Sequence, residues 1–493
     1  MKQWCIVDII DVTIEGGGIQ MRKLKVLFVA SEAVPFAKTG GLADVIGSLP
    51  QALKKQEIDA RVALPYYKEV DNCDMQKQGN WTEFHNVFEF QGDVTTYFIK
   101  NDHYFHRDEL YGYDDDNERY AYFCRTVLDM LPHIDFIPDI IHCNDWQTGP
   151  ICLLLKDHYK NDPRYAHIKS VFTIHNIQYQ GLFGRKSLDI LGISHSYFNP
   201  DAIEFYEYVS YMKAGIVYAD LITTVSPSYA KEIQTSTYGY GLDGILRKRS
   251  NVVHGIINGI DEGKYNPETD PDLYENYSLG NLDGKKDGKR KFQEEFGLAQ
   301  EDKMIVAIIT RLAVQKGLDL FHHTIDGVWM MDKLMENDIQ FVLLGTGEPE
   351  YEEMFKHLAD KYPGRVSINI TFNEALSHKI YAASDVFLMP SLFEPCGLGQ
   401  LIAMKYGSVP IVRKTGGLKD TVIHYNEKAK TGTGFEFEEY SGYWLYRKIN
   451  EAYKIYTEKP KDFEQIRANG MSSEFGWAKS AKEYIKRYHT LMK

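Results

Sequence analysis

Residues 25–55 read KVLFVASEAVPFAKTGGLADVIGSLPQALKK, and this stretch decides the fold class. The run KVLFVA (25–30) is almost wholly apolar, as in a strand that is buried on both faces of a parallel sheet. The segment LADVIGSLPQALKK (42–55) has the apolar spacing of an amphipathic helix. A strand, a glycine-bearing loop and a helix in this order predict an α/β fold.

The same alternation continues along the chain, which at 493 residues is too long for a single core. After a polar stretch at 270–291 the pattern of strands and helices starts again. We therefore expect two α/β domains that join before or within this stretch. The predicted strands are ARVALP (60–65), DIIHCND (139–145), SVFTIHN (170–176), LITTVS (221–226), MIVAIITRL (304–312), QFVLLGTG (340–347), RVSINIT (365–371), DVFLMPS (385–391) and VPIVRKT (409–415).

The domain boundaries that we predict follow from these patterns. Residues 1–20 are expected to be an N-terminal extension or the result of a misplaced start, because Met21 is followed by a segment that reads like a fresh start. The N-terminal domain covers 21–256 and the C-terminal nucleotide-sugar domain covers 257–474. A last amphipathic helix within 475–493 is expected to return to the N-terminal domain.

The string KTGGL-x-D occurs twice, at 38–44 and at 414–420. Paired glycines let backbone N–H groups approach an anion closely, and a helix N-terminus adds a positive dipole. In doubly wound sheets, ligands bind beyond the carboxyl ends of the strands. Two such loops favour a ligand site that both domains line. The alternative is that each loop is only a tight turn between a strand and a helix.

The composition limits the class of protein. Hydrophobic residues make up 44% and charged residues 25%, which is typical of a globular protein, and the net charge of −13 disfavours nucleic acid or an anionic membrane as a partner. The six cysteines show no metal-binding or disulfide-like spacing, which suits a reducing compartment. The N-terminus is a poor signal peptide, and no apolar run is long enough to span a membrane. A cytoplasmic location is expected.

Two polar clusters follow predicted strands of the second domain. Arg311 and Lys316, in TRLAVQKGLD, are suited to a diphosphate, since arginine can bind it bidentately and lysine acts as a point charge. Glu394 and Cys396, in PSLFEPCGLG, lie in a turn before a helix, where a carboxylate is stabilised by the helix dipole. The alternatives are an exposed basic loop and a simple helix cap. The place of Cys396 in this turn also makes its oxidation a testable hypothesis.

Two further clusters follow strands of the first domain. His175 and Asn176 end the apolar run in FTIHNIQYQG, and Asp145 ends the run in HCNDW. Loops at such strand ends commonly carry function. For His175, the alternative is a core histidine that the backbone satisfies.

No metal or dinucleotide site is evident in the sequence. The aspartates at 114–116 lie in a loop rich in tyrosine and aspartate, and we interpret them as solvated rather than metal-binding. The chain has no G-x-G-x-x-G after the first strand and no GxxxxGK[ST], so a dehydrogenase or a P-loop enzyme is poorly supported.

Taken together, the motifs resemble those of the bacterial and plant-type glycogen (starch) synthase family. The matching segments are KTGGLADVIGSLP (38–50), FTIHNIQYQG (172–181), NGID (258–261), TRLAVQKGLDL (310–320) and FEPCGLGQL (393–401). The resemblance runs in order from about Lys25 to the C-terminus. It implies a GT-B architecture, in which two Rossmann-like doubly wound domains face each other across a deep cleft.

The resemblance also implies an activity. Members of this family are retaining hexosyltransferases that move glucose from ADP-glucose to the non-reducing 4-OH of an α-1,4-glucan, glycogen or a maltooligosaccharide. They require no metal or other cofactor. For a retaining enzyme, front-face transfer and double displacement both stay open, since the sequence marks no clear carboxylate nucleophile.

The resemblance assigns roles to individual residues. The catalytic set is Lys38, His175, Arg311, Lys316 and Glu394: Lys38 is expected at the donor phosphate, Arg311 and Lys316 at the diphosphate, Glu394 at the glucose hydroxyls, and His175 at the glucose 6-OH and the charge that develops at C1. The expected substrate-binding residues are Gly40, Gly41, Asp44, Tyr113, Asp145, Asn176, Gln180, Asn258, Phe372, Cys396, Gly397, Leu398, Gly399 and Thr415.

Two departures from the family pattern leave alternatives open. Phe372 stands where relatives often carry tyrosine, and Gly399 where threonine is common, so a preference for UDP-glucose stays open. A sucrose-synthase-like transferase or a phosphorylase is another alternative, although a phosphorylase would need a pyridoxal phosphate lysine and a longer chain. A non-catalytic glucan-binding relative is the third.

Overall fold

The computed structural model describes residues 12–15, 18–73, 79–84 and 86–493. Much of the predicted N-terminal extension, residues 1–11 and 16–17, lies outside the described residues. Its remaining part contributes two short strands, β1 (Val12–Glu15) and β2 (Gly18–Met21), which pair antiparallel.

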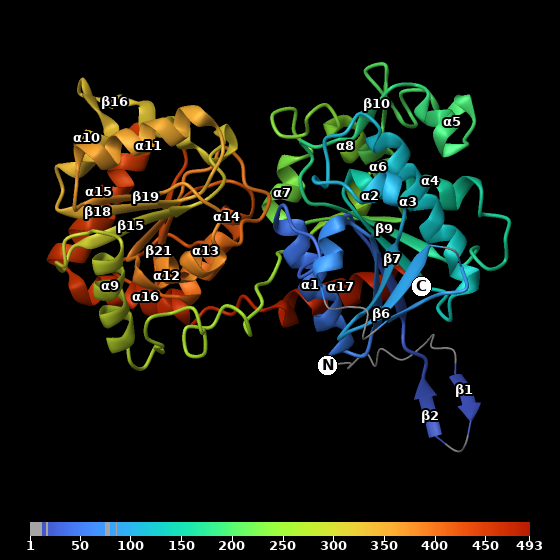
Figure 1. Ribbon diagram of the computed structural model, residues 1–493, viewed down its shortest axis with the longest axis horizontal. Helices are drawn as coiled ribbons and strands as arrows, with labels where there is room; N and C mark the ends of the chain where they lie inside the picture. Colours follow the sequence, from blue (N-terminus) through green and yellow to red (C-terminus); the bar gives the residue numbers. More distant parts are fainter. Residues whose placement is uncertain (1–11, 16–17, 74–78, 85) are drawn as a thin grey trace, which may run out of the picture. The chain divides into compact units, whose positions relative to one another are not determined.

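The chain divides into two compact units (Figure 1). The first contains residues 1–225, 230–256 and 477–493, and the second contains 226–229 and 257–476. The polar stretch at 270–291 therefore lies wholly within the second unit. The end of this stretch forms the start of a helix, whose buried residues recur with helical spacing.

The first unit is built on a nine-stranded sheet of order β14-β13-β9-β8-β3-β4-β7-β6-β5. From β14 to β7 all neighbours are parallel, and β6 and β5 add antiparallel pairs at one edge. The strands are β3 (Lys25–Val29), β4 (Asp59–Pro65), β5 (Gly79–Trp81), β6 (Val87–Gln91), β7 (Thr95–Ile99), β8 (Ile140–Asn144), β9 (Lys169–Ile174), β13 (Leu221–Thr224) and β14 (Val253–Gly255).

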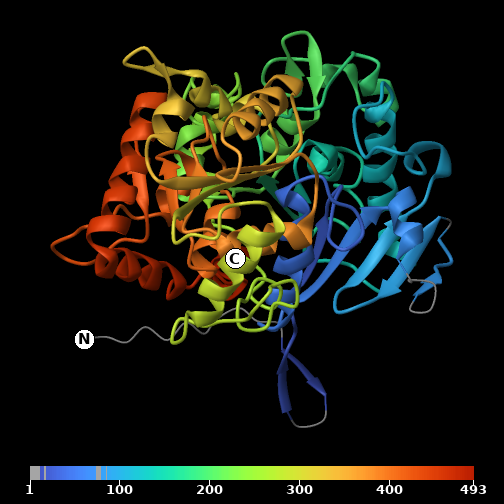
Figure 2. The same cartoon turned by 60° about the vertical axis from the view of Figure 1, so that its left-hand side comes forward.

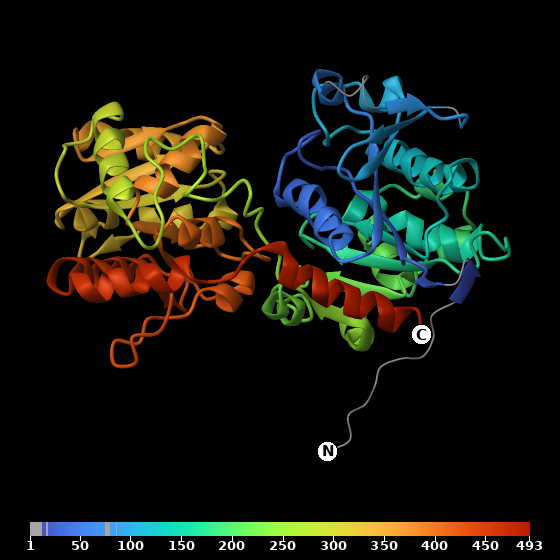
Figure 3. The same cartoon turned by 90° about the horizontal axis from the view of Figure 1, so that it is seen from below.

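The helices of this unit include a C-terminal one that returns to it. Helix α17 packs beside α1, and Tyr488 on α17 bonds to the buried His142 of β8 at 2.7 Å (Figure 3). A small antiparallel sheet, β10-β12-β11, completes the unit. The helices are α1 (Gly41–Lys54), α2 (Asp102–Phe105), α3 (Asp116–Met130), α4 (Gly149–Asp157), α5 (Ser187–Leu191), α6 (Tyr211–Tyr218), α7 (Pro227–Glu232), which both units share, α8 (Asp243–Lys248) and α17 (Trp477–Leu491), and the small strands are β10 (Leu182–Phe183), β11 (Glu204–Phe205) and β12 (Tyr208–Ser210).

The second unit is built on a six-stranded parallel sheet of order β19-β18-β15-β20-β21-β22. In order along the chain this is 3-2-1-4-5-6, the doubly wound order of a Rossmann fold. The strands are β15 (Met304–Ile309), β18 (Ile339–Leu344), β19 (Val366–Asn369), β20 (Val386–Met389), β21 (Val409–Arg413) and β22 (Phe435–Phe437), and a separate hairpin pairs β16 (Thr324–Ile325) with β17 (Val328–Trp329).

Helices cover both faces of this sheet (Figures 1 and 2). Alternate residues of β15 enter two different cores: Val306 and Ile308 face one, and Ile305 and Ala307 face the other. The first core includes residues of α10 (Met330–Met335), α11 (Pro349–Lys361), α15 (Gly442–Glu458) and α16 (Pro460–Met471), and the second includes residues of α9 (Asp283–Glu295), α12 (Glu374–Ala383), α13 (Gly399–Lys405) and α14 (Gly416–Thr421).

Each apolar run named from the sequence contains a strand, and the segment 42–55 contains α1. In each sheet the order of the strands reverses direction at one place, the switch point. It lies between β3 and β8 in the first sheet and between β15 and β20 in the second. In doubly wound sheets the ligand crevice opens at this point, beyond the carboxyl ends of the strands.

Candidate functional site

The first KTGG loop follows β3 at the switch point of the first unit. The buried carboxylate of Glu32 holds this loop: it accepts hydrogen bonds from Thr39 N at 2.6 Å, Thr39 Oγ1 at 2.8 Å and Gly40 N at 3.0 Å. The Tyr111 hydroxyl donates to the same carboxylate at 2.6 Å. Sequence reasoning missed Glu32 and Tyr111, although Glu32 lies three residues after the end of the buried strand β3, which was a usable signal.

Lys38 lies at the start of this loop and forms an ion pair with Asp44 on the first turn of α1, at 2.8 Å. Because Gly40 N already donates to Glu32, the anion contact expected of the loop depends on Lys38 and on Gly41. A Cβ atom built at Gly40 or Gly41 would meet nothing within 4 Å, so the loop borders open space at both glycines.

His175 follows β9 and is held in one tautomer. Its Nε2 lies 2.9 Å from Oδ1 of Asn144, whose side-chain nitrogen donates to the carbonyls of Val29 and His142. The oxygen of the Asn144 amide therefore faces the ring, so Nε2 carries the hydrogen and Nδ1 carries a lone pair. Burial lowers the pKa of His175 to about 3, which keeps the ring neutral.

Asp145 follows β8 in the left-handed region, with a φ of 57°. Its carboxylate accepts the backbone N–H of His175 at 2.7 Å and that of Asn176 at 3.4 Å. Burial raises its pKa to about 7, although these two N–H groups act in the opposite direction. A non-glycine residue held in this conformation is typical of a site that the fold constrains for function.

Three other residues predicted for the first unit have structural partners. Asn176 caps a local turn, since its Oδ1 accepts Gln178 N at 3.0 Å, and Gln180 donates to the Tyr240 carbonyl at 2.9 Å. The guanidinium groups of Arg107 and Arg119 lie 4.8 and 4.9 Å from the centre of the Tyr113 ring. Tyr111, two residues earlier, is the tyrosine that donates to Glu32, the carboxylate that holds the Lys38 loop.

The interpretation of the aspartates at 114–116 as solvated is wrong for the last two. Asp115 forms two hydrogen bonds with Arg107, each of 2.6 Å. Asp116 is buried and pairs with Arg119, which the structure buries completely. These carboxylates hold α3 and its preceding loop, because a buried guanidinium needs a charged partner.

In the second unit, the predicted residues meet at the switch point between β15 and β20. Lys316 Nζ lies 2.7 Å from Glu394 Oε2, and Ser391 Oγ donates to the same oxygen at 3.1 Å. The Glu394 side chain is buried. Arg311 follows β15, its side chain is exposed, and it has no hydrogen-bond or ion-pair partner among the described residues. Arg311 and the lysine–carboxylate pair follow the carboxyl ends of the neighbouring strands β15 and β20, which suits an anionic ligand at this end of the sheet.

The second KTGG loop has a different role from the first. A Cβ at Gly416 would lie 2.0 Å from the Glu394 carbonyl oxygen, and one at Gly417 would lie 2.3 Å from the Cys396 carbonyl oxygen. Gly416 also has a φ of +46°, and Gly417 N donates to the Glu394 carbonyl at 3.1 Å. Thr415 is buried. The glycines of this loop let it pack against the turn that carries Glu394. The expected place of Thr415 at the ligand stays a prediction.

The segment after Glu394 shows why glycines stand there. Gly397 has a φ of +74°, and a Cβ at Gly399 would lie 3.1 Å from the Phe387 ring, so a larger residue would press on the core. Leu398 directly precedes α13. Asn258 donates its backbone N–H to the Cys396 sulfur, and burial raises the pKa of this thiol to about 12. The hypothesis of a readily oxidised Cys396 is therefore not supported, because a thiol is reactive as its thiolate.

Phe372 lies in the loop after β19, and 83% of its side chain is exposed. An exposed aromatic ring at the carboxyl edge of a sheet is available for stacking on a base or a sugar.

One group of potential metal ligands lies elsewhere. Asp270, Asp272 and His378 have ligand atoms within 4.8 Å of one another. Asp270 already pairs with His378 at 2.6 Å and accepts a hydrogen bond from the Tyr406 hydroxyl. These contacts explain the cluster without a metal, because they join the loop that carries Asp270 to His378 on α12.

Comparisons with known proteins identify the family. A model described as the starch synthase catalytic domain matches residues 25–248, and a model of glycosyl transferases group 1 matches 289–469. The chain is 48% identical over 482 residues to the glycogen synthase of Alkaliphilus metalliredigens, covering 95% of this chain and 100% of the relative. The chain belongs to the glycogen and starch synthase family.

Other relatives match nearly the same length of the chain. The glycogen synthase of Clostridium beijerinckii is 49% identical over 482 residues, covering 95% of this chain and 99% of the relative. The solved catalytic domain of starch synthase IV from Arabidopsis thaliana, bound to ADP and acarbose, superposes with a TM-score of 0.86 at 32% identity and covers 96% of this chain and all of that one. The predicted family and the GT-B fold are confirmed, and the protein is a glycosyltransferase.

More distant structures share only the fold. Sucrose-phosphate synthase from Thermosynechococcus elongatus superposes with a TM-score of 0.60 at 17% identity, covering 95% of this chain and 99% of that one. Among the described residues, no helix is both long and apolar enough to cross a membrane.

Proposed function

We propose that this glycosyltransferase moves glucose from ADP-glucose to the non-reducing 4-OH of an α-1,4-glucan, glycogen or a maltooligosaccharide, with retention at C1 and without a metal or other cofactor. We place this reaction in the cytoplasm. The observation that carries the proposal is the Lys316–Glu394 pair with the free Arg311 at the switch point of the second unit. The Arabidopsis relative, solved with ADP and acarbose, supports this choice of donor and acceptor.

Departure of ADP leaves negative charge on its β-phosphate while C1 becomes oxocarbenium-like. Fixed cations must neutralise this charge where no metal does so. Arg311 and Lys316 supply them in the second unit, and Lys38 supplies one in the first. Glu394, held in one position by Lys316 and Ser391, accepts hydrogen bonds from the glucose hydroxyls.

His175 acts as a neutral hydrogen-bonding group. Because Nε2–H is committed to Asn144, Nδ1 is left to accept a hydrogen bond from the glucose 6-OH. Its pKa of about 3 means that the ring does not add a positive charge beside an oxocarbenium-like carbon at neutral pH.

Retention is proposed to follow the front-face route, in which the leaving phosphate takes the proton of the acceptor hydroxyl. Glu32 and Glu394 are buried carboxylates of the candidate site, and each accepts hydrogen bonds from at least two donor groups. A carboxylate held in this way is better suited to positioning other groups than to nucleophilic attack. Mass spectrometry during turnover tests this route. A glucosyl adduct on either carboxylate would establish double displacement instead.

The donor is tested by measuring nucleoside diphosphate release from ADP-glucose and from UDP-glucose, each with glycogen and EDTA. A clear preference for ADP-glucose with growth of the glucan supports the proposal. Preference for UDP-glucose would keep the site but contradict the donor, and would direct attention to Phe372. Glycogen binding without turnover of either donor would contradict the enzymatic role.

A further inference from the structure

Gln400 is a buried glutamine in the first turn of α13, just after the turn that carries Glu394. Its Nε2 donates to the carbonyl of Cys396 at 3.1 Å, to that of Gly397 at 2.9 Å and to Oγ1 of Thr421 at 3.1 Å. A polar side chain costs free energy at a buried position unless it is hydrogen-bonded. The function of Gln400 is therefore to be sought in the groups that it holds.

The orientation of the Gln400 amide follows from these partners. The two carbonyl oxygens can only accept, and the Thr421 hydroxyl is committed as a donor to the Gly417 carbonyl at 2.7 Å. The nitrogen must therefore face all three groups. The other amide atom, Gln400 Oε1, is buried and has no hydrogen-bond partner among the described residues.

Gly397 lets the amide approach the turn. A Cβ atom at this position would lie 2.5 Å from Gln400 Oε1, so any larger residue would push the amide away. Among the described residues, the carbonyls of Cys396 and Gly397 accept no hydrogen bond except those from Gln400. This one side chain therefore fixes the direction of both carbonyls.

The direction of a carbonyl also determines that of an N–H group. In a planar trans peptide the C=O and the N–H point to opposite sides. The carbonyl of Cys396 shares its peptide plane with the N–H of Gly397, and the carbonyl of Gly397 shares its plane with the N–H of Leu398. Because both carbonyls face Gln400, both N–H groups point away from it.

These two N–H groups are available to a ligand. Gly397 and Leu398 are partly exposed, and their N–H groups donate to no acceptor among the described residues. They belong to the turn that carries Glu394, beyond the carboxyl end of β20 and at the switch point of the sheet. Successive backbone N–H groups without partners are typical of phosphate-binding loops.

We propose that Gln400 is a positioning residue for the diphosphate of the donor: its amide turns two peptide groups so that the N–H groups of Gly397 and Leu398 face the phosphate oxygens. This inference rests on the function proposed above, because it requires a nucleoside diphosphate to bind beside Glu394. Gln400 does not touch the ligand and acts through the two residues that precede α13.

The test is isothermal titration of the full-length protein with ADP. Gln400→Met keeps an unbranched side chain of similar length but removes the amide that holds both carbonyls. It is expected to weaken ADP binding at least about tenfold, because two hydrogen bonds to a charged phosphate lose their orientation.

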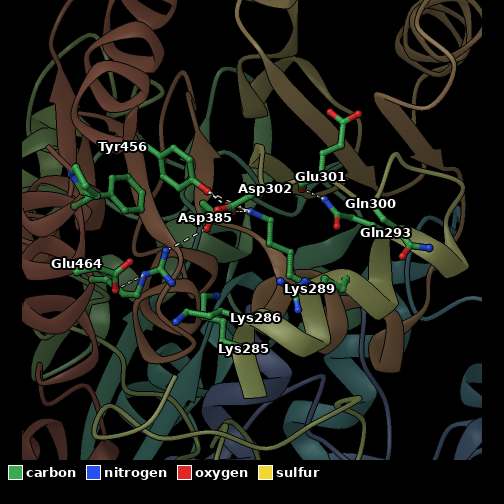
Figure 4. Close-up of a pocket in the computed structure, with 14 residues that line it drawn as sticks. Lys285, Lys286, Lys289, Gln293, Gln300, Glu301, Asp302, Asp385, Tyr456 and Glu464 are labelled. Carbon is green, nitrogen blue, oxygen red and sulfur yellow. Dashed lines mark hydrogen bonds and ion pairs between the residues drawn. The ribbon is translucent and has the colours of Figure 1, made fainter. Parts of the chain in front are cut away.

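Gln293→Met is the matched control. Gln293 is also buried, its Nε2 donates to the Glu301 carbonyl at 2.8 Å, and its Oε1 has no partner among the described residues. It lines a pocket together with Asp385, which directly precedes β20, whereas Glu394 follows that strand (Figure 4). Urea unfolding of both variants shows whether they lose a similar free energy of unfolding. The control is expected to leave ADP binding unchanged.

A second variant, Gln400→Glu, tests whether the donated hydrogen bond matters. An ionised glutamate would repel the two carbonyls, whereas its protonated form can donate one hydrogen bond. Burial raises the pKa of a carboxyl group, so ADP binding by this variant should recover toward the wild-type value as the pH falls from about 8 to about 6. Each variant is compared with the wild type at the same pH. Gln400→Met should show no such recovery, and a merely structural role of Gln400 predicts none in either variant.

The outcomes separate this inference from the proposed function. If the wild type binds ADP and Gln400→Met binds it equally well, the positioning role alone is overturned. Equal losses in Gln400→Met and Gln293→Met would overturn it in the same way. A wild-type protein that binds neither ADP nor UDP would overturn the proposed function and this inference together.

Discussion

Lys316 and Glu394 form an ion pair, and both are proposed to bind the donor in the second unit. Lys316 orients a buried carboxylate and, on this account, also faces the donor phosphate, so its removal affects both groups. The pair is largely buried, and its geometry is further fixed by Ser391. This distinguishes it from exposed ion pairs, which contribute little.

Lys316→Gln is expected to lower kcat/KM for ADP-glucose by about tenfold to a hundredfold or more, because losing a charged hydrogen bond costs roughly 1.5–3 kcal/mol and about 1.4 kcal/mol is tenfold. Steady-state kinetics measure this loss. Lys333→Gln, at a half-buried lysine of α10 that pairs with Glu336, is the control and should leave kcat/KM unchanged. Equal activity in both variants would contradict the role of Lys316.

Asp145 gives the protein a pH dependence with a definite sign. Its pKa is about 7 in the folded protein against an ordinary 3.8, so between these values the folded state holds a proton that the unfolded state has lost. The contribution of Asp145 to stability is therefore greatest below about pH 4 and falls as the pH rises to about 7.

Asp145→Asn removes this titration and keeps an oxygen that can accept the His175 N–H. As the pH rises from 4 to 7, the free energy of unfolding of the variant should increase relative to that of the wild type. Urea titrations of both proteins at several pH values measure this difference. A difference that does not change with pH would contradict the raised pKa.

The two KTGG loops show that one sequence motif can serve two purposes at the scale of an element. Both follow a strand and precede a helix, and both are therefore predicted from the sequence as strand–loop–helix units. Their surroundings differ, because the second is packed against the chain at Glu394–Cys396 and the first borders open space. Tertiary contacts of this kind leave no local signal.

Gly41→Ala and Gly417→Ala are matched tests of these roles. Gly41→Ala should leave the free energy of unfolding near its wild-type value, since the new methyl group meets nothing within 4 Å, but should reduce turnover of the donor. Gly417→Ala should destabilise the protein by about 1–3 kcal/mol, because its Cβ would overlap the Cys396 backbone.

Urea unfolding and donor turnover of the two variants provide the measurement. A stable and active Gly41→Ala would contradict a close ligand approach at the first loop. An undisturbed Gly417→Ala would contradict the packing role of the second.

At the scale of the whole molecule, the sequence predicted the two α/β units because buried parallel strands are nearly continuous apolar runs. The strands β5, β6 and β7 were not predicted, since the antiparallel pairs at this edge leave a weaker apolar pattern. The helix α9 was not predicted either, because lysine and glycine make up most of its buried face. Lys316 and Glu394 were predicted to act in the same site, and their side chains are in contact in the structure. Glu32, Tyr111 and Asn144 were missed, because their importance arises from contacts between segments far apart in the chain.

The central claim, metal-independent transfer of glucose from ADP-glucose, is tested most directly by nucleoside diphosphate release in the presence of glycogen and EDTA. The account predicts rapid release of ADP from ADP-glucose, elongation of the glucan and much slower release of UDP from UDP-glucose. Loss of ADP release on adding EDTA, with recovery when a divalent cation is restored, would contradict it.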